Sequence, residues 1–278
     1  MTKGLIITAD DFGAAFAVNE AVEMAHRKGV LSAASLMVTG DAFDDAVARA
    51  KAMPSLGVGL HLVLVEGRPC LPPEQVPDLV DSQGRFRANM ALAGITIFAK
   101  PAARRQLFAE VAAQFAIFAE TGLPLDHVNT HKHFHLHPTI SSAILASGRR
   151  YGMKAIRAPI EPRGVLARIE AGAGRFDIAQ PWARLVSRRM HKAGMLVPDQ
   201  VFGLAWSGAL DAQRLRGLIA NLPAGLSEIY CHPATDDRYP GHAPGYAYRA
   251  ELAALMDGQA ADMIAQAGIK RGRFADFA

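Results

Sequence analysis

The chain has 278 residues, of which 50% are hydrophobic and 20% are charged, and its formal net charge at pH 7 is +4. This composition is typical of a soluble globular protein with a large core, and the mild charge excludes a protein that wraps a polyanion. The two cysteines, Cys70 and Cys231, lie far apart in the sequence. They predict neither a disulfide scaffold nor a cysteine zinc site, and a reducing cytoplasm is the expected location.

The sequence carries no recognisable targeting or membrane-spanning segment. Met1-Thr2-Lys3 leads directly into an apolar run, so no signal peptide is expected, and no apolar stretch is long enough to span a bilayer. Any membrane contact is therefore expected to be peripheral, at the inner membrane. Basic pairs such as Arg104-Arg105 are typical of solvated faces, and because no aromatic-plus-basic motif accompanies them we expect no nucleic-acid partner.

Short apolar runs alternate with longer helical patterns along almost the whole chain. We expect strands at residues 5–9, 31–38, 57–60, 126–129, 154–157, 200–203 and 225–231, and a last one after Gly268. The expected helices are residues 15–29, 41–53, 101–122, 138–151, 181–194, 211–221 and 249–267. Residues 65–99 interrupt the alternation of strands and helices, because they are rich in Pro and Gly and show no clear periodicity. We interpret them as a lid or substrate loop.

Repeated strand–helix units predict a parallel sheet with helices outside it. The expected fold class is α/β, a distorted (β/α) barrel similar to a TIM barrel, in a single domain over residues 1–278. An open doubly wound sheet is the alternative, but no Gly-rich dinucleotide loop or Walker sequence supports it.

Two adjacent carboxylates, Asp10 and Asp11, end the first apolar run. The carboxyl ends of strands are where α/β folds place their chemistry. Neighbouring strand residues point to opposite sides, so the two acids are expected to meet different partners, one a metal and the other free as a base. The alternative is a helix cap, which Asp commonly provides.

Histidines occupy every second position from His131 to His137. If this segment is extended, these four imidazoles share one face, and imidazole is the commonest metal ligand. The alternative is a solvent-facing polar edge. His61 and His232 each lie at the end of another expected strand. The alternative for His61 is a histidine that is hydrogen-bonded in the core or in a loop, and the alternative for His232 is a histidine that caps the next turn.

One carboxylate and two imidazoles make an open metal site that leaves positions for water and substrate. Such a metal acidifies bound water and polarises a carbonyl oxygen, while a second carboxylate can take the proton from that water. An imidazole that is not a ligand suits a general acid, because imidazole titrates near neutral pH. This set of groups is what amide or ester hydrolysis requires.

Four motifs, spread over most of the chain, resemble those of the YdjC-like carbohydrate deacetylase family, which removes N-acetyl groups from sugars. They are Thr8-Ala9-Asp10-Asp11-Phe12-Gly13, Gly59-Leu60-His61-Leu62, His131-Lys132-His133-Phe134-His135 and Cys231-His232-Pro233. The resemblance implies a distorted (β/α) barrel, one divalent metal ion (Mg²⁺ or Zn²⁺) and a homodimer.

The resemblance also implies roles for individual residues. Asp11, His61 and His131 would bind the metal, Asp10 would be the general base and His232 the general acid. The substrate is expected to contact His133, His135 and Arg157, the last of which is the only obvious cation at a strand end.

Within the family, Glu66-Gly67-Arg68-Pro69 and the segment Leu125–Asn129 look most like the hopanoid biosynthesis-associated deacetylase branch. This likeness implies an N-acetylglucosaminyl hopanoid as substrate, with soluble chitooligosaccharides as the alternative. The chitooligosaccharide branch usually has Asp where this chain has Asn129, so no ligand or base role is carried over to that position. A metal-dependent phosphoesterase and a sugar- or lipid-binding module are the alternatives of another class.

Overall fold

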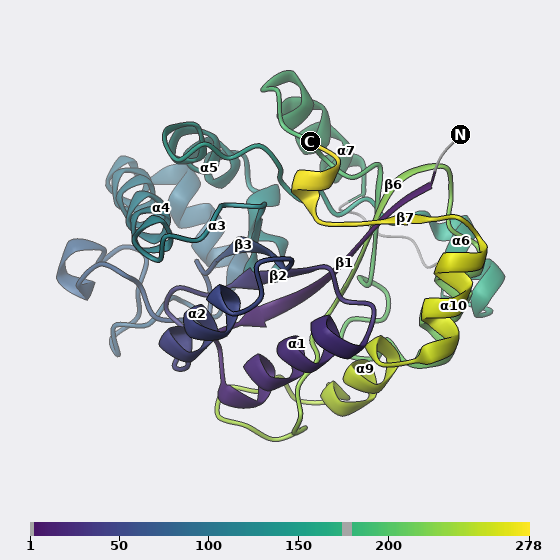
Figure 1. Cartoon of the computed structure of the whole chain (residues 1–278). Coiled ribbons are helices and arrows are strands. Elements are labelled where there is room, and N and C mark those ends of the chain that lie inside the picture. Colours follow the sequence, from purple (N-terminus) through teal and green to yellow (C-terminus); the bar gives the residue numbers. More distant parts are fainter. Residues whose placement is uncertain (1–2, 174–179) are drawn as a thin grey trace.

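Parallel strands build the centre of the molecule in the computed structural model, which describes residues 3–173 and 180–278 (Figure 1). Met1, Thr2 and residues 174–179, which belong to the expected 1–278 domain, lie outside the described residues. The sheet has the order β4-β3-β2-β1-β6-β5, and β7 pairs with β1. The strands are β1 (Lys3–Phe12), β2 (Ala33–Leu36), β3 (Gly57–Leu62), β4 (Val128–Thr130), β5 (Gln200–Phe202), β6 (Gly225–Cys231) and β7 (Lys270–Arg271).

The sheet curls into a half-barrel in which the first strand pairs with a late one. β1 lies between β2 and β6, and both pairings are parallel. On the far side, the segment 155–160 stands between β4 and β5 and makes only isolated contacts. Ile156 bridges to Val128, Ala155 bridges to Leu196, and the amide of Val201 donates to the carbonyl of Ile160 at 2.8 Å. The expected single-domain, distorted barrel is therefore confirmed, and the strand expected at residues 154–157 is reduced to these bridges.

Helices cover the outside of the sheet (Figure 1). They are α1 (Phe16–Lys28), α2 (Phe43–Lys51), α3 (Met90–Ala99), α4 (Pro101–Glu120), α5 (Pro138–Arg150), α6 (Arg163–Ile169), α7 (Gln180–Lys192), α8 (Ala212–Ala220), α9 (Tyr248–Leu255) and α10 (Gly258–Gln266). The apolar run of β1 is buried on both faces, as expected for a parallel strand that has helices outside it. Among the described residues, no helix combines the length and hydropathy needed to cross a membrane.

Two further expected elements differ from the structure. The helix expected at 249–267 is divided into α9 and α10, because Asp257 leaves the helical conformation and its carboxylate caps the amide of Gln259. The loop expected at 65–99 ends in a regular helix, α3, whose first turn is capped by Asn89 through a 3.0 Å hydrogen bond from Leu92 N.

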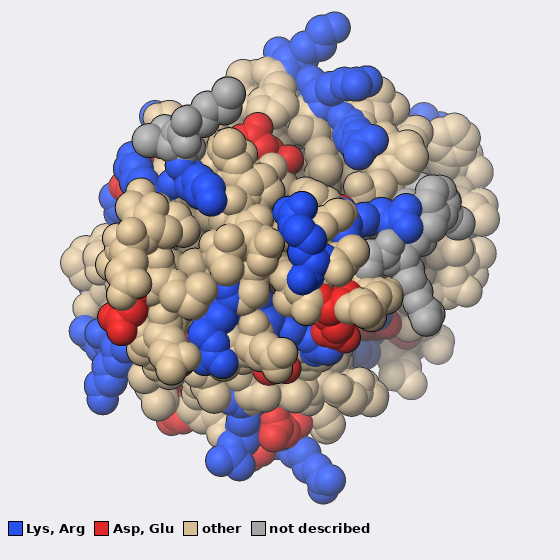
Figure 2. All heavy atoms as spheres, turned by 90° about the vertical axis from the view of Figure 1, so that its right-hand side faces the viewer, with Lys and Arg blue, Asp and Glu red and all other residues tan. Residues whose placement is uncertain are grey.

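Charged side chains are dispersed on the face that carries α6 and α10 (Figure 2). Lysines and arginines stand among carboxylates and uncharged residues there, without forming one continuous basic surface. This distribution agrees with the mild net charge of +4.

Candidate active site

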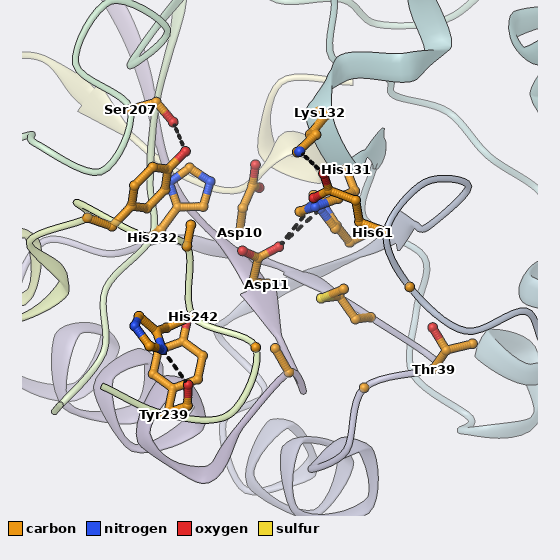
Figure 3. Close-up of a pocket in the computed structure, with 18 of the residues that line it drawn as sticks. Asp10, Asp11, Thr39, His61, His131, Lys132, Ser207, His232, Tyr239 and His242 are labelled. Atoms are coloured by element: carbon orange, nitrogen blue, oxygen red, sulfur yellow. Dashed lines mark hydrogen bonds and ion pairs between the residues drawn. The ribbon is translucent and has the colours of Figure 1, made fainter. Parts of the chain in front are cut away.

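A pocket of about 760 Å³ opens at the carboxyl ends of the strands. Its floor holds Asp10 and Asp11 from the end of β1, and its walls come from loops at residues 37–41, 66–68 and 239–246. Figure 3 shows His61 and His131 on one side of the two aspartates and His232 on the other. Parallel strands thus bring residues from distant parts of the sequence to one edge of the sheet.

Asp11, His61 and His131 form a cluster that could hold a metal ion. The Oδ1 atom of Asp11 lies 3.3 Å from Nε2 of His61 and 3.5 Å from Nδ1 of His131. The three ligand atoms lie within 4.8 Å of one another. Asp11 Oδ1 and His61 Nε2 are buried and make no hydrogen bond with the described residues. Because buried polar atoms are normally satisfied, this arrangement fits a cation that binds all three.

The carboxylate of Asp11 is kept ionised by its neighbours. Burial by itself would raise the pKa of Asp11, but the imidazoles of His131 and His61 hold it well below its usual range. An ionised carboxylate is the form that binds a metal.

A turn in the backbone brings Asp11 into the pocket beside Asp10. Asp11 has φ of 62° and Gly13 has φ of 94°, and the register between β1 and β2 shifts between Ala9 and Phe12. Asp tolerates this left-handed conformation better than most residues. The alternation of a regular strand was expected to separate the two acids. Instead, the turn lets both line the pocket with different partners.

Asp10 is almost fully buried and is held by a cation and an amide. Arg157 donates to it through Nη1 at 2.5 Å and through Nη2 at 3.0 Å, and Asn129 Nδ2 donates at 2.9 Å. Burial would raise the pKa of Asp10, but the charge and hydrogen bonds of Arg157, together with the nearby His61 and His232, outweigh burial and hold the pKa below its usual range. Asp10 is therefore a fixed, ionised carboxylate beside the cluster of Asp11, His61 and His131.

His232 follows β6 and stands against aromatic rings. Its ring centroid lies 5.6 Å from that of Tyr230 and 5.2 Å from that of Tyr246, whose hydroxyl is 2.8 Å from Ser207 Oγ. The backbone amide of His232 donates to the carboxylate of Glu251. These contacts fix the imidazole on the pocket wall opposite the cluster of Asp11, His61 and His131.

Residues 4–266 match the family described as YdjC-like protein. The chain belongs to the YdjC-like family. A carbohydrate deacetylase of Geobacillus stearothermophilus is 30% identical over the whole of this chain and 99% of its own length. One from Brevibacillus brevis is 42% identical, over 53% of this chain and 56% of its own length. A crystal structure from Enterococcus faecalis, of a candidate cellobiose-phosphate cleavage protein, superposes with a TM-score of 0.78, 26% identity and full coverage of both chains.

Two of the residues expected to contact substrate lie beneath the pocket of this YdjC-like chain. Arg157 is fully buried between Asp10 and Glu228, whose Oε1 is 2.7 Å from Nη2, and its guanidinium lies 4.4 Å from the centre of the Tyr230 ring. His135 is also fully buried, with Nδ1 2.7 Å from Thr130 Oγ1. Burial and the nearby Arg157 lower the pKa of His135 to about 3, so it is neutral. Neither residue lines the pocket, and both support residues that do.

The histidine segment is not extended, so the condition under which its four imidazoles would share one face is not met. Residues His131–Leu136 form a 3-10 turn in which Lys132 and His133 have φ of 52° and 53°. The turn sends the imidazoles in different directions. His131 and His133 line the pocket, His133 Nε2 lies 3.0 Å from the Tyr230 hydroxyl, and His137 caps the amide of Thr139 at the start of α5.

Asn129 is the residue that sequence reasoning missed. Its Oδ1 lies 2.7 Å from Nδ1 of His61, and its Nδ2 donates to Asp10 and, at 2.9 Å, to Ser35 Oγ. With the His61 proton on Nδ1, the Nε2 lone pair is free to face Asp11 and a metal. Its position at the end of the expected strand 126–129 and the Asp that the chitooligosaccharide branch usually has at this position were the available signals, and neither revealed this bridging role.

Proposed function

We propose that the chain is a metal-dependent hydrolase that removes the N-acetyl group from an acetylated amino sugar. The observation that carries this proposal is that Asp11, His61 and His131 converge in one pocket with a second carboxylate, Asp10, which is not part of the ligand set. Membership of the YdjC-like family and the relatives called carbohydrate deacetylases support the same reaction.

Asp11, His61 and His131 are the proposed ligands of one divalent cation, Mg²⁺ or Zn²⁺. When bound, the cation would supply Lewis acidity to the acetyl carbonyl and acidify a water molecule. Asn129 keeps His61 in the tautomer that offers Nε2 to the cation.

The remaining residues hold and move protons. Asp10 accepts the proton of the attacking water, and Arg157 and Asn129 fix its orientation. His232, across the pocket, donates a proton to the departing amine. His133, whose ring faces the pocket and is tied to Tyr230, is the proposed substrate contact.

The proposed substrate is an N-acetylglucosaminyl hopanoid, with deacetylation of soluble chitooligosaccharides as the competing assignment. The motif Glu66-Gly67-Arg68-Pro69 supports the hopanoid assignment, and its residues Glu66, Gly67 and Arg68 line the pocket. The loop at 65–99 is proposed to act as a lid, and the functional unit is proposed to be a homodimer.

The test is acetate release by the purified chain, stripped with a chelator and reloaded with Mg²⁺ or Zn²⁺. Diacetylchitobiose and an N-acetylglucosaminyl glycolipid in detergent are compared as substrates. We expect acetate release only from reloaded protein, and faster release from the glycolipid. Strong turnover of chitobiose alone would remove the hopanoid assignment. Release of phosphate from phosphoesters without any release of acetate would remove the deacetylase assignment.

A further inference from the structure

Helix α3 leaves most of its apolar surface uncovered. Its sequence, Met90–Ala99, contains no charged residue, yet only Ala93 and Ile97 are buried. Leu92, Ile95 and Phe98 are 48%, 64% and 66% exposed. Their spacing of three residues places them along one side of the helix.

Helix α7 presents a second set of exposed apolar side chains. Trp182 is 43% exposed and Leu185 is 51% exposed, one turn apart, whereas Ala183, Val186 and Met190 face the core. A helix with an outward Trp–Leu pair followed by basic residues is typical of segments that lie in a membrane interface.

The two sets meet at the turn between β4 and α5. The Phe98 ring centroid lies 6.5 Å from that of His137, and the Trp182 indole donates to the carbonyl of Leu136. Leu136 and His137 are neighbours in the chain, so α3 and α7 flank the same short segment. We call Leu92, Ile95, Phe98, Trp182 and Leu185 the apolar patch.

Exposed arginines lie on α7, which carries part of the apolar patch, and on α4, which packs against α3. Arg184 and Arg188 are exposed on α7, and Arg104 and Arg105 are exposed on α4, one turn before Phe108, which is itself 38% exposed. None of these four arginines has an ion-pair partner among the described residues. Large apolar side chains with basic neighbours complement a bilayer with anionic headgroups.

We propose that the apolar patch and its arginines dock the protein on the surface of an anionic lipid bilayer. A second copy of this chain fits less well, because a twofold contact through this surface would bring two copies of the same arginine-bearing surface into one interface, with like charge on both sides. The segment that the patch flanks begins with His131, which lines the pocket. Docking therefore holds the pocket close to the lipid surface.

The proposal is tested by co-sedimentation with vesicles of phosphatidylcholine, alone or mixed with phosphatidylglycerol. We expect the full chain to bind the mixed vesicles and to be released by salt. The double substitution Ile95→Ser and Phe98→Ser should weaken binding more than about tenfold, because it removes two inserted apolar side chains. Arg184→Glu with Arg188→Glu should remove the preference for phosphatidylglycerol, since each basic residue contributes about fivefold near such a surface.

Phe16→Ser is the matched control, because Phe16 is 62% exposed but lies on α1, outside the apolar patch. It should bind vesicles like the unchanged protein, and circular dichroism should show every variant folded. Absence of vesicle binding by the unchanged protein, or binding unaffected by both double substitutions, would overturn the proposal. So would conversion of a dimer to a monomer by the Ile95 and Phe98 changes, seen by light scattering without vesicle binding. The measurement needs no turnover, so it fails or succeeds independently of the deacetylase assignment.

Discussion

Asp10 and Asp11 are neighbours in the chain and yet have separate electrostatic surroundings. Asp10 is paired with the guanidinium of Arg157, and Asp11 faces two imidazoles. The left-handed backbone at Asp11 makes this separation possible, because it turns one carboxylate toward β3 and the histidine turn. Each acid can therefore serve a different step of one reaction.

Asp10→Asn should leave metal binding intact and abolish most turnover, because the amide keeps the shape but cannot accept a proton. We expect acetate release to fall by about 10²–10⁴-fold, while elemental analysis finds the same metal content as in the unchanged protein. His61→Ala is the comparison, since it should lose the metal itself. Near-normal acetate release by Asp10→Asn would remove Asp10 from the base role.

Asn129→Ala should weaken metal binding, because His61 Nδ1 loses the acceptor that fixes its tautomer and ring orientation. Losing such an orienting partner typically costs about 10–100-fold in metal affinity, measurable by competition with a chromogenic chelator. Ser35→Ala is the control, since Ser35 hydrogen-bonds Asn129 but has no bond to His61. Equal effects of the two substitutions would show that general packing, not orientation of His61, is responsible.

At the scale of elements, one buried side chain of α4 anchors the beginning of the expected lid. Glu110 accepts hydrogen bonds from the amides of Cys70 at 2.8 Å and Leu71 at 3.0 Å. One turn later, the side chain of Gln114 accepts a hydrogen bond from the amide of Val63 and donates one to the carbonyl of the same residue. The segment that leaves β3 is therefore fixed to the barrel as far as Leu71, and any lid movement has to begin beyond it.

Glu110→Ala should release this anchor. The two amides lose their acceptor, which costs about 1–3 kcal/mol for each buried group left unsatisfied. We expect a lower free energy of unfolding in urea and faster hydrogen exchange at residues 70 and 71. Glu120→Ala, at the exposed end of the same helix, should change neither. Unchanged exchange in the Glu110 variant would contradict the anchoring role.

Asp126 ties the C-terminal turn (Phe274–Asp276) to the barrel. Its carboxylate accepts from the amides of Phe274 at 3.3 Å and Ala275 at 2.9 Å. Burial would raise the pKa of Asp126, but the hydrogen bond from His127 and those from the two amides lower it below the unfolded value of 3.8. Its contribution to stability is therefore present above the unfolded value and is lost as the pH falls through the folded one.

Asp126→Ala should lower the free energy of unfolding by about 1–3 kcal/mol near neutral pH, with a smaller difference from the unchanged protein as the pH falls below about 4. Urea unfolding at several pH values measures both effects. Asp262→Ala, on the exposed face of α10, should show no such pH-dependent difference. If the difference in free energy of unfolding between Asp126→Ala and the unchanged protein did not vary with pH, the ionised carboxylate would not be what holds the turn.

At the scale of the whole molecule, the cluster of Asp11, His61 and His131 joins three parts of the barrel that are distant in sequence. Asp11 ends β1, His61 lies in β3 and His131 follows β4. A cation bound by all three binds only the folded chain, so binding should stabilise the entire fold.

Zn²⁺ or Mg²⁺ added to chelator-treated protein should therefore raise the melting temperature. At a free concentration of about 100 times Kd the gain is about 2.7 kcal/mol, which differential scanning fluorimetry detects. His61→Ala should abolish the shift, and His191→Ala, an exposed histidine of α7, should retain it. An equal shift in both variants would place the stabilising ion elsewhere.

The sequence by itself determined the architecture and most of the pocket. Alternating apolar runs and helical patterns follow from local periodicity, and they placed Asp11, His61, His131 and His232 after strands that a parallel sheet brings to one edge. These inferences succeed because side-chain alternation and helix periodicity depend on neighbours a few residues apart. The helix expected at 249–267 failed where a single capping residue, Asp257, outweighed that periodicity.

Only the tertiary structure decided which polar groups support the pocket. Arg157 and Asp10 are 147 residues apart, and His61 and Asn129 are 68 apart, so no local pattern relates them. Likewise the left-handed turn at Asp11 and the 3-10 turn of the histidine segment contradict the regular strand geometry that the sequence suggests. Both turns bring side chains against partners that exist only once the barrel has formed, Asp11 beside His61 and His131 and His133 beside Tyr230.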